Sequence, residues 1–373
     1  FLTIFFISVL LFFLGSGIWV ALSMIGVSAI GMILFTSRPV GDAMATTIWG
    51  TASSWTLTAL PLFVWMGEIL FRTKLSENLF KGLSPWMQKL PGGLIHVNVV
   101  GCALFAAISG SSAATVATVG KMSIPELRKR NYPEKILLGS LAGSGTLGLL
   151  IPPSIILIIY GVAVQESIAK LFIAGIIPGI MIALIFMSYV VIWSLINKKE
   201  MPQILEEYSF FEKIKRSKQL LPVILLITSV IGSIYTGVAT ATEAASLGVV
   251  GALILSYFQS SLTLETFKSS LLGATKTSCM IAFILAGSTF LSLAMGFTGL
   301  PRNLAVWIQN MNLSPYLLIL VLMIFYIILG MFLDGISAVV LTMAIIEPMI
   351  RQAGFDMIWF GIFLVIVVEM AQI

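Results

Sequence analysis

The residues best suited to chemistry form a run of small and hydroxyl side chains that ends in two prolines. Residues 143–154 read Gly-Ser-Gly-Thr-Leu-Gly-Leu-Leu-Ile-Pro-Pro-Ser. Proline removes a backbone donor and clashes with the preceding turn, so this run, here named the break, predicts a broken helix. Its freed carbonyls and nearby hydroxyls can coordinate a dehydrated sodium ion, and a half-helix N-terminus can attract an anionic group. A structural kink packed against a neighbour is the alternative.

Two polar interruptions lie inside long apolar stretches. Ser-Gly-Ser-Ser at 109–112, the first tip, interrupts the stretch 94–120, and Asp-Gly-Ile-Ser at 334–337, the second tip, interrupts 315–345. Two short helices that meet at such a tip predict a re-entrant hairpin. One long helix with small residues at a packing face is the alternative. Because the first tip accompanies the break, we interpret this combination as an ion site.

Three titratable residues lie inside apolar stretches of the chain. Intramembrane carboxylates are usually functional, so Asp334 is a candidate site residue, with helix capping as the alternative. Glu243 stands where a helix should start, and first-turn capping explains it. His96 opens the first hairpin, either as a proton relay or as an interfacial imidazole whose hydrogen bonds are satisfied.

The composition indicates that lipid is the solvent. The chain has 373 residues, of which 58% are hydrophobic and 10% charged, and its mean hydropathy is +1.06. A soluble domain carries roughly a quarter charged residues, so this chain is expected to be a multi-pass membrane protein. The net charge is +5, and the basic residues form short clusters between apolar runs. That distribution is typical of topology signals and excludes a nucleic-acid partner.

The elements that must position the site follow from the apolar stretches, since a spanning helix needs about 20 residues. The apolar stretches are 1–14, 17–36, 57–71, 94–120, 134–162, 168–196, 220–238, 242–258, 273–297, 315–345 and 357–373. The segments 40–56 and 76–90 are amphipathic and tryptophan-containing, which predicts helices that lie in the membrane interface.

The two halves of the chain resemble each other at a constant shift of 223 positions. The shift pairs Ser23 with Ser246, Ala29 with Ala252, Gly50 with Gly273, Pro125 with Pro348, Arg128 with Arg351 and Tyr132 with Phe355. The tips pair only with a two-residue gap, which matches Gly110 with Gly335. Counterparts of the two prolines of the break would fall beyond Ile373, so we expect the natural protein to continue with a second proline-rich break.

Charge then predicts the orientation of the halves. Segment 121–135 holds five basic residues, whereas its partner 344–358 holds only Arg351. Basic loops face the cytoplasm, so equivalent loops are expected on opposite faces, as in inverted repeats. We therefore predict a first repeat plus a connecting helix at 1–196, with a hairpin at about 94–120 and a broken helix at about 134–162. A cytoplasmic linker at 197–219 leads to a second, inverted repeat at 220–373, with a hairpin at about 315–345 and a broken helix from about 357.

No enzyme signature accompanies these features. The segment 115–122 faintly echoes a phosphate-binding loop, but Thr115 replaces the first glycine and Met122 replaces the final Ser/Thr. Zinc-ligand spacing and a nucleophile elbow are missing from the sequence. We therefore expect no enzymatic activity, no transition metal and no organic cofactor, and we expect an ion gradient rather than ATP as the energy source.

The motifs taken together resemble the large membrane subunit of tripartite ATP-independent periplasmic (TRAP) transporters. The segments that carry the resemblance are Ala59–Phe63 with Met66-Gly67, Ser109–Thr115, Gly148–Ser154, Glu166–Phe172 with Ala174-Gly175 and Pro178-Gly179, Thr242–Ala245 and Gly330–Asp334. The resemblance implies an elevator-type transporter, in which a mobile domain with both hairpins moves against a fixed scaffold. It implies two partners: a small membrane subunit of about four helices and a periplasmic substrate-binding protein.

The resemblance also implies a cargo and site residues. The substrate would be an organic acid such as a C4-dicarboxylate, a sialic acid or a keto acid, carried across the bacterial inner membrane. One Na⁺ site would use the first tip with the break, and another the second tip with a break after Ile373. The expected sodium ligands are Ser109, Gly110, Ser111, Ser112, Ser144, Gly145, Gly148, Pro152, Gly335 and Ser337. The expected substrate contacts are Ser112, Thr115, Pro153 and Asp334.

Two other functions remain open from the sequence. A standalone sodium-coupled dicarboxylate symporter would share the hairpins but need no binding protein. An ion channel would need a continuous polar pore, which paired hairpins do not predict.

Overall fold

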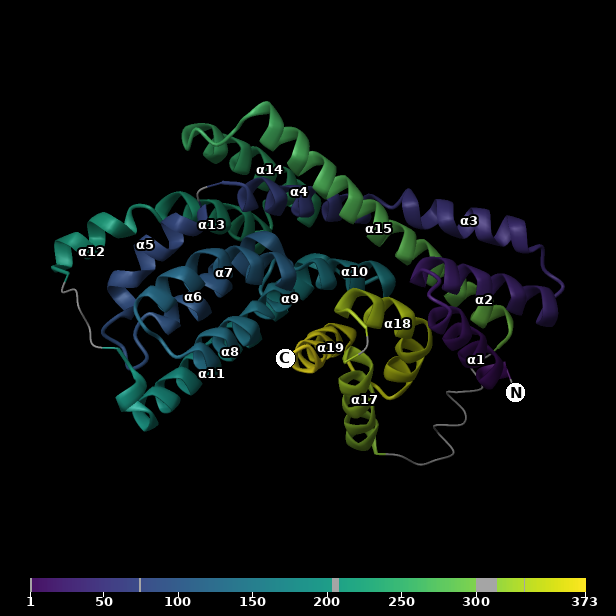
Figure 1. Cartoon of the computed structure of the whole chain (residues 1–373). Coiled ribbons are helices and arrows are strands. Elements are labelled where there is room, and N and C mark those ends of the chain that lie inside the picture. Colours follow the sequence, from purple (N-terminus) through teal and green to yellow (C-terminus); the bar gives the residue numbers. More distant parts are fainter. Residues whose placement is uncertain (1, 74, 203–207, 300–313, 332) are drawn as a thin grey trace. The chain divides into compact units, whose positions relative to one another are not determined.

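All regular secondary structure in the described residues is helical, in a computed structural model that covers residues 2–73, 75–202, 208–299, 314–331 and 333–373 (Figure 1). In chain order the elements are α1 (Leu2–Gly15), α2 (Val20–Phe35), α3 (Val40–Ala52), η1 (Trp55–Thr58), α4 (Ala59–Phe71), α5 (Leu75–Met87), α6 (Ile95–Ser109), α7 (Ser112–Lys129), α8 (Glu134–Gly145), α9 (Leu147–Leu150), α10 (Ile155–Ala163), α11 (Ile168–Ile196), η2 (Lys198–Glu200), α12 (Phe210–Ser217), α13 (Leu221–Tyr235), α14 (Ala241–Phe258), α15 (Leu264–Phe297), α17 (Pro315–Gly330), α18 (Gly335–Gln352) and α19 (Met357–Ala371). Residues 203–207 of the predicted linker and Phe332 before the second tip lie outside the described residues.

Several of these helices are long and apolar enough to cross a membrane. Within the described ranges there are 5 such helices, or up to 7 if each bent pair of helices forms one span. The broken run from α8 to α10 counts as one of them, at Glu134–Ala163. The chain is therefore an all-helical polytopic membrane protein, as its composition predicted.

The chain divides into two compact units that do not coincide with its two halves. One unit comprises Phe1–Thr58, Ile158–Leu171 and Lys276–Gln372, and the other comprises Ala59–Leu157, Phe172–Thr275 and Ile373. The first tip and the break belong to the second of these units, whereas the second tip belongs to the first. Each unit is described by itself below.

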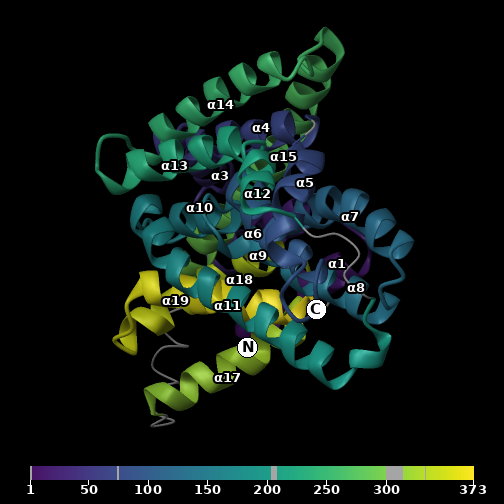
Figure 2. The ribbon, with the colours of Figure 1, turned by 90° about the vertical axis from the view of Figure 1, so that its left-hand side faces the viewer.

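The unit that holds the first tip is built around the hairpin α6–α7. These two helices pack on each other and on α8 and α9 (Figure 1). Nearby in the same unit, α14 packs on α4 and on α13 (Figure 2). The two helices α4 and α14 are in close contact, since a β-carbon at Gly248 would stand 2.5 Å from the Met66 sulfur.

The unit that holds the second tip contains a second hairpin, α17–α18, and both of its helices pack against α19. The hydroxyls of Tyr326 in α17 and Thr342 in α18 lie 2.7 Å apart and join the two arms. Where α17 meets α19, a β-carbon at Gly330 would lie 2.6 Å from the β-carbon of Ala371, so this position requires a small residue.

Two helices differ from what the apolar stretches predicted: α15 begins earlier than its stretch, and α12 lies within the predicted linker. Helix α15 has 34 residues and begins at Leu264, ahead of the apolar stretch 273–297, because no proline or glycine pair interrupts the polar turns before it. The predicted linker contains α12, which begins with a capping box of Ser209 and Glu212. The capping role expected of Glu243 is confirmed, since its carboxylate accepts the Thr240 N–H at 2.8 Å.

The second arms of the two hairpins repeat with the shift found in the sequence. Helices α7 and α18 each have 18 residues and begin at Ser112 and Gly335, 223 positions apart. Both contain an interior proline at equivalent positions, Pro125 and Pro348. The helices that follow, α8 and α19, begin at Glu134 and Met357 with the same separation.

The turns that end these arms also match. A left-handed residue follows each arm: Asn131 with φ 57° after α7 and Gly354 with φ 80° after α18. In each turn the next residue's N–H reaches back five positions, from Tyr132 to Leu127 at 3.1 Å and from Phe355 to Ile350 at 3.2 Å. Hydrogen bonds of this kind satisfy the last carbonyls of a helix. The backbone geometry of both arms therefore follows one pattern.

The predicted pairing of Gly110 with Gly335 is wrong. Gly110 ends α6 in the left-handed conformation, with φ 59°, whereas Gly335 is the first residue of α18. The residues that correspond without any gap are the N-caps Ser111 and Asp334. Each accepts a backbone N–H three positions on, from Ala114 at 3.5 Å and from Ser337 at 3.2 Å. A hydroxyl and a carboxylate perform one capping role, so a match by residue type overlooked their equivalence.

Candidate functional site

The break interrupts the membrane helix twice. Helix α8 ends at Gly145, the single turn of α9 follows, and α10 starts only at Ile155. Hydroxyl groups replace some of the lost backbone partners: Thr146 donates to the Gly143 carbonyl at 2.8 Å, and Ser154 donates to the Leu149 carbonyl. The Ser154 oxygen also accepts the Leu157 N–H at 3.3 Å. The prediction of a broken helix is confirmed.

The first tip is joined to the break through backbone atoms. The Gly110 carbonyl accepts the Ile155 N–H at 3.3 Å. A β-carbon at Gly110 would stand 2.7 Å from the Pro153 carbonyl oxygen, and the left-handed φ of 59° already favours glycine there. The tip therefore lies against the backbone that follows the two prolines.

A second glycine brings the other side of the break onto the tip. A β-carbon at Gly148 would stand 2.6 Å from the Ser111 carbonyl oxygen and 2.8 Å from the Ser112 nitrogen. A β-carbon at Gly145 would collide with the side chain of Val116 in α7. Gly148 therefore lets the backbone of the break approach the backbone of the tip, and Gly145 makes room for the Val116 side chain.

Three oxygens of the first tip form a cluster, two from buried residues and one from the half-buried Ser111. The hydroxyls of Ser109 and Thr115 lie 2.9 Å apart, and both residues are buried. Thr115 also donates to the Ser111 carbonyl at 2.7 Å, which lies 3.3 Å from the Ser109 hydroxyl. We name Ser109, Ser111 and Thr115 the oxygen cluster.

The structure unites most, though not all, of the predicted residues of this site. Ser109, Gly110, Ser111, Ser112, Thr115, Gly145, Gly148 and Pro153 belong to the tip and to the break residues in contact with it. Ser144 is buried and donates to the Ser140 carbonyl at 2.5 Å, within its own helix. Pro152 contacts α11, where a β-carbon at Gly175 would lie 3.5 Å from the proline ring.

The residues of the second tip lie in the other unit and form a helix start. Asp334 is exposed and caps α18, so the capping alternative is confirmed as one role of this carboxylate. Gly335 and Ser337 are buried in the first turn of that helix. Of the predicted residues, these three make up the second tip.

The first tip and the break carry no formal charge. Between positions 95 and 125 the only charged residue is Lys121, and residues 136–165 have none. Over the residues that the structure describes, no group of three or more His, Cys, Asp or Glu side chains could hold a metal ion. A set of carbonyl and hydroxyl oxygens suits an alkali cation better than a transition metal.

Sequence reasoning missed two polar groups. Ser154 bridges the broken ends, and a hydroxyl directly after two prolines could have signalled it. Asn98 joins the hairpin to α8 by donating to the Leu137 carbonyl at 3.2 Å and to Ser140 at 3.0 Å. His96 was predicted either as a proton relay or as an imidazole whose hydrogen bonds are satisfied. Its ring nitrogen Nε2 lies 2.7 Å from the Pro91 carbonyl, whereas Nδ1 is buried and has no hydrogen-bond partner among the described residues. Only one of the two ring nitrogens is therefore satisfied.

Comparison with known proteins decides the family. The model for "Tripartite ATP-independent periplasmic transporter, DctM component" matches residues 5–373. The chain belongs to the DctM family of TRAP transporters. The resemblance inferred from the motifs is thereby confirmed, and the family comprises transporter permeases rather than enzymes.

Relatives within the TRAP family differ in the substrates that their names give. The chain is 33% identical to the C4-dicarboxylate TRAP transporter large permease protein DctM of Pseudomonas aeruginosa, over 94% of this chain and 81% of that protein. It is 31% identical to the sialic acid TRAP transporter large permease protein SiaM of Vibrio cholerae, over 93% and 81%. It is 32% identical to the 2,3-diketo-L-gulonate TRAP transporter large permease protein YiaN of Escherichia coli, over 87% and 76%.

The fold has a relative among solved structures. Neisseria gonorrhoeae MtrF, described with a class of antimetabolite efflux pumps, matches with a TM-score of 0.55 over 89% of this chain and 74% of that one. Sequence identity is 12%, so the likeness concerns the fold alone.

Proposed function

We propose that this TRAP permease imports an organic acid across the bacterial inner membrane and draws its energy from a Na⁺ gradient. The observation that carries the proposal is the uncharged oxygen cluster held against the backbone of the break. Such a site offers carbonyl and hydroxyl oxygens to a dehydrated cation and demands no proton exchange. The ligands come from both arms of the first hairpin, α6 and α7. If these arms can separate, ion binding would favour the conformation in which they are together.

The substrate class comes from the three relatives described above, which are named for a C4-dicarboxylate, a sialic acid and a diketo sugar acid. All three are carboxylates. We propose that an anionic carboxylate binds beside the ion, near Ser112, Thr115 and Pro153, where the N-terminus of α7 favours negative charge. We also propose Asp334, at the second tip, as a substrate contact.

The tripartite family implies two further components, which we propose to be a small membrane subunit of four helices and a periplasmic substrate-binding protein. The binding protein would deliver the carboxylate, and an elevator movement of the hairpins would carry it across. Basic residues of 121–135 and of the linker would face the cytoplasm.

Uptake into proteoliposomes tests this function. The full-length permease, reconstituted with its small subunit, is given a panel of labelled carboxylates with and without an inward Na⁺ gradient and added binding protein. Uptake that requires both identifies a tripartite sodium-driven importer and its substrate. Sodium-driven uptake without the binding protein identifies a standalone symporter, and flux independent of any gradient identifies a channel.

The ion site is tested separately by Ser111→Ala and Ser112→Ala. Both variants are expected to weaken the dependence of uptake on Na⁺ concentration. An unchanged sodium affinity in both would rule out these two hydroxyls as ligands.

A further inference from the structure

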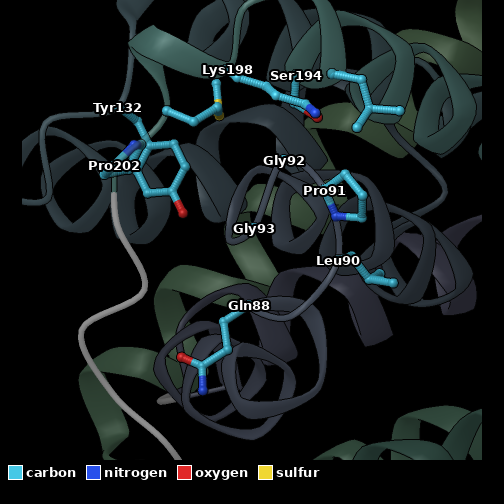
Figure 3. Close-up of a pocket in the computed structure, with 11 residues that line it drawn as sticks. Gln88, Leu90, Pro91, Gly92, Gly93, Tyr132, Ser194, Lys198 and Pro202 are labelled. Carbon is cyan, nitrogen blue, oxygen red and sulfur yellow. The ribbon is translucent and has the colours of Figure 1, made fainter.

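A cavity of 240 Å³ lies away from the tip and the break, at the end of α11 (Figure 3). Three segments of one unit line it: the loop after α5, the turn between α7 and α8, and the end of α11 with η2. Its polar lining includes Gln88, Tyr132, Ser194 and Lys198, and its apolar lining includes Leu90 and Leu195. None of the residues assigned to ion or substrate binding lines this cavity.

A hydrogen-bond donor is held in place at this cavity by the turn before α6. The Tyr132 hydroxyl accepts the Leu94 N–H at 3.0 Å, which leaves its own proton free to donate. Gly93 has φ 55°, and a β-carbon there would collide with the Tyr132 oxygen, so glycine permits this contact. Burial raises the pKa of Tyr132 more than the Leu94 hydrogen bond and the charge of Arg130 lower it, so the phenol keeps its proton.

A positive charge completes the donor set. Lys198 is exposed at the cavity rim, and no hydrogen bond or ion pair engages its ammonium group in the part of the chain that the structure describes. Figure 3 shows Lys198 and Ser194 at the top of the view, Tyr132 at the left and Gln88 at the bottom. The segments 88–93, 126–135 and 194–202 together hold seven basic and three acidic residues, so an anion is attracted here.

The apolar helix beside the cavity indicates what kind of anion fits. The 29-residue helix α11 could span a membrane, and most of its apolar length is not buried inside the protein. Near the cavity its exposed side chains are apolar: Ile192 is 59% exposed, Leu195 49% and Ile196 76%. Because this face of a membrane-spanning helix lies against acyl chains, a lipid with an anionic head can lay its tails on α11 and its head at the cavity, whereas a free anion would use the cavity alone.

We propose that this cavity binds the headgroup phosphate of an anionic phospholipid, with Lys198 and the Tyr132 hydroxyl as donors and the acyl chains along α11. The basic residues around it place this end of the protein at the cytoplasmic leaflet, where anionic lipids concentrate. Bound there, the lipid fastens the end of α11 to the turn between α7 and α8. The proposal does not depend on which substrate is carried.

Lipid titration of the purified full-length protein tests the site. Short-chain phosphatidylglycerol, phosphatidylcholine and inorganic phosphate are each titrated while tryptophan fluorescence and the unfolding midpoint are recorded. The wild type should bind phosphatidylglycerol in preference to the other two ligands. Lys198→Gln should weaken that binding about fivefold, since one basic residue near a membrane surface contributes about 1 kcal/mol. Tyr132→Phe should weaken it by a similar factor through the lost hydrogen bond.

Lys199→Gln is the matched control, because it removes the same charge one residue away and does not line the cavity. It should leave binding within about twofold of the wild type, and Lys198→Arg should restore most of what Lys198→Gln loses. If Lys198→Gln and Lys199→Gln weaken phosphatidylglycerol binding equally, the lipid responds only to general surface charge, and the proposal is overturned. Equal binding of phosphatidylcholine, or competition by inorganic phosphate at the lipid's own affinity, would also overturn it.

Discussion

The α-carbon of Gly148 lies so close to Ser111 that a β-carbon at position 148 would stand 2.6 Å from the Ser111 carbonyl oxygen. The first tip and the break are therefore packed backbone to backbone, with no space for a side chain. This contact places the Ser111 carbonyl at the centre of the oxygen cluster. Any change in the separation of the two segments must move that carbonyl.

Gly148→Ala should impair sodium-driven uptake. The added methyl group meets backbone atoms that cannot rotate away, and overpacking of this kind costs about 1–3 kcal/mol, so we expect an uptake rate reduced about tenfold. Gly139→Ala is the control, because a β-carbon there meets nothing within 4 Å and the residue lies in α8, ahead of the break. The prediction fails if both variants transport alike at equal abundance.

The hydroxyls of the oxygen cluster should contribute to sodium affinity. Ser109→Ala and Thr115→Val each remove one hydroxyl from the 2.9 Å contact, and a lost hydrogen-bonding group is worth about 1 kcal/mol. Each variant should raise the Na⁺ concentration for half-maximal uptake about fivefold. Ser188→Ala serves as the control, since its exposed hydroxyl bonds only to the Leu184 carbonyl of its own helix. Sodium curves that overlay for all three variants would contradict the prediction.

Two substitutions at Asp334 separate capping from a role in transport. Asparagine retains an oxygen for the Ser337 N–H, so Asp334→Asn should keep the unfolding temperature, whereas Asp334→Ala should lose about 1 kcal/mol of stability. If the charge serves substrate or ion, Asp334→Asn loses uptake while staying folded. Full uptake by Asp334→Asn would restrict this carboxylate to its capping role.

Arg351 should hold the turn after α10 against α18. Its guanidinium donates to the Val164 carbonyl at 3.0 Å and lies 3.6 Å from Glu166, while its 2.9 Å bond to Glu347 stays within one helix. Arg351→Ala should therefore lower uptake more than Glu347→Gln does. Because the pair with Glu166 is partly exposed, its coupling in a double-mutant cycle should not exceed about 1 kcal/mol. A larger loss from Glu347→Gln would argue that the bond within the helix matters more.

Much of the candidate site could be predicted from the sequence. Glycine, serine and proline act locally, so the break at 143–154 and the tip at Gly110 follow from residue types alone. The repeat shift of 223 was visible for the same reason, through Pro125 and Pro348. The pairing of the tips was not, because Ser111 and Asp334 share a capping oxygen but differ in residue type.

The sequence by itself determined that this protein is helical, lies in a membrane and breaks its helices at two tips and one proline pair. Those properties depend on hydrophobic length and on local backbone chemistry. Only the tertiary structure decided that Gly110 and Gly148 hold the first tip on the break, and that Tyr132 and Lys198 share a cavity. Residues about 40 or more positions apart met there because packing selects close backbone approach, which no local pattern encodes.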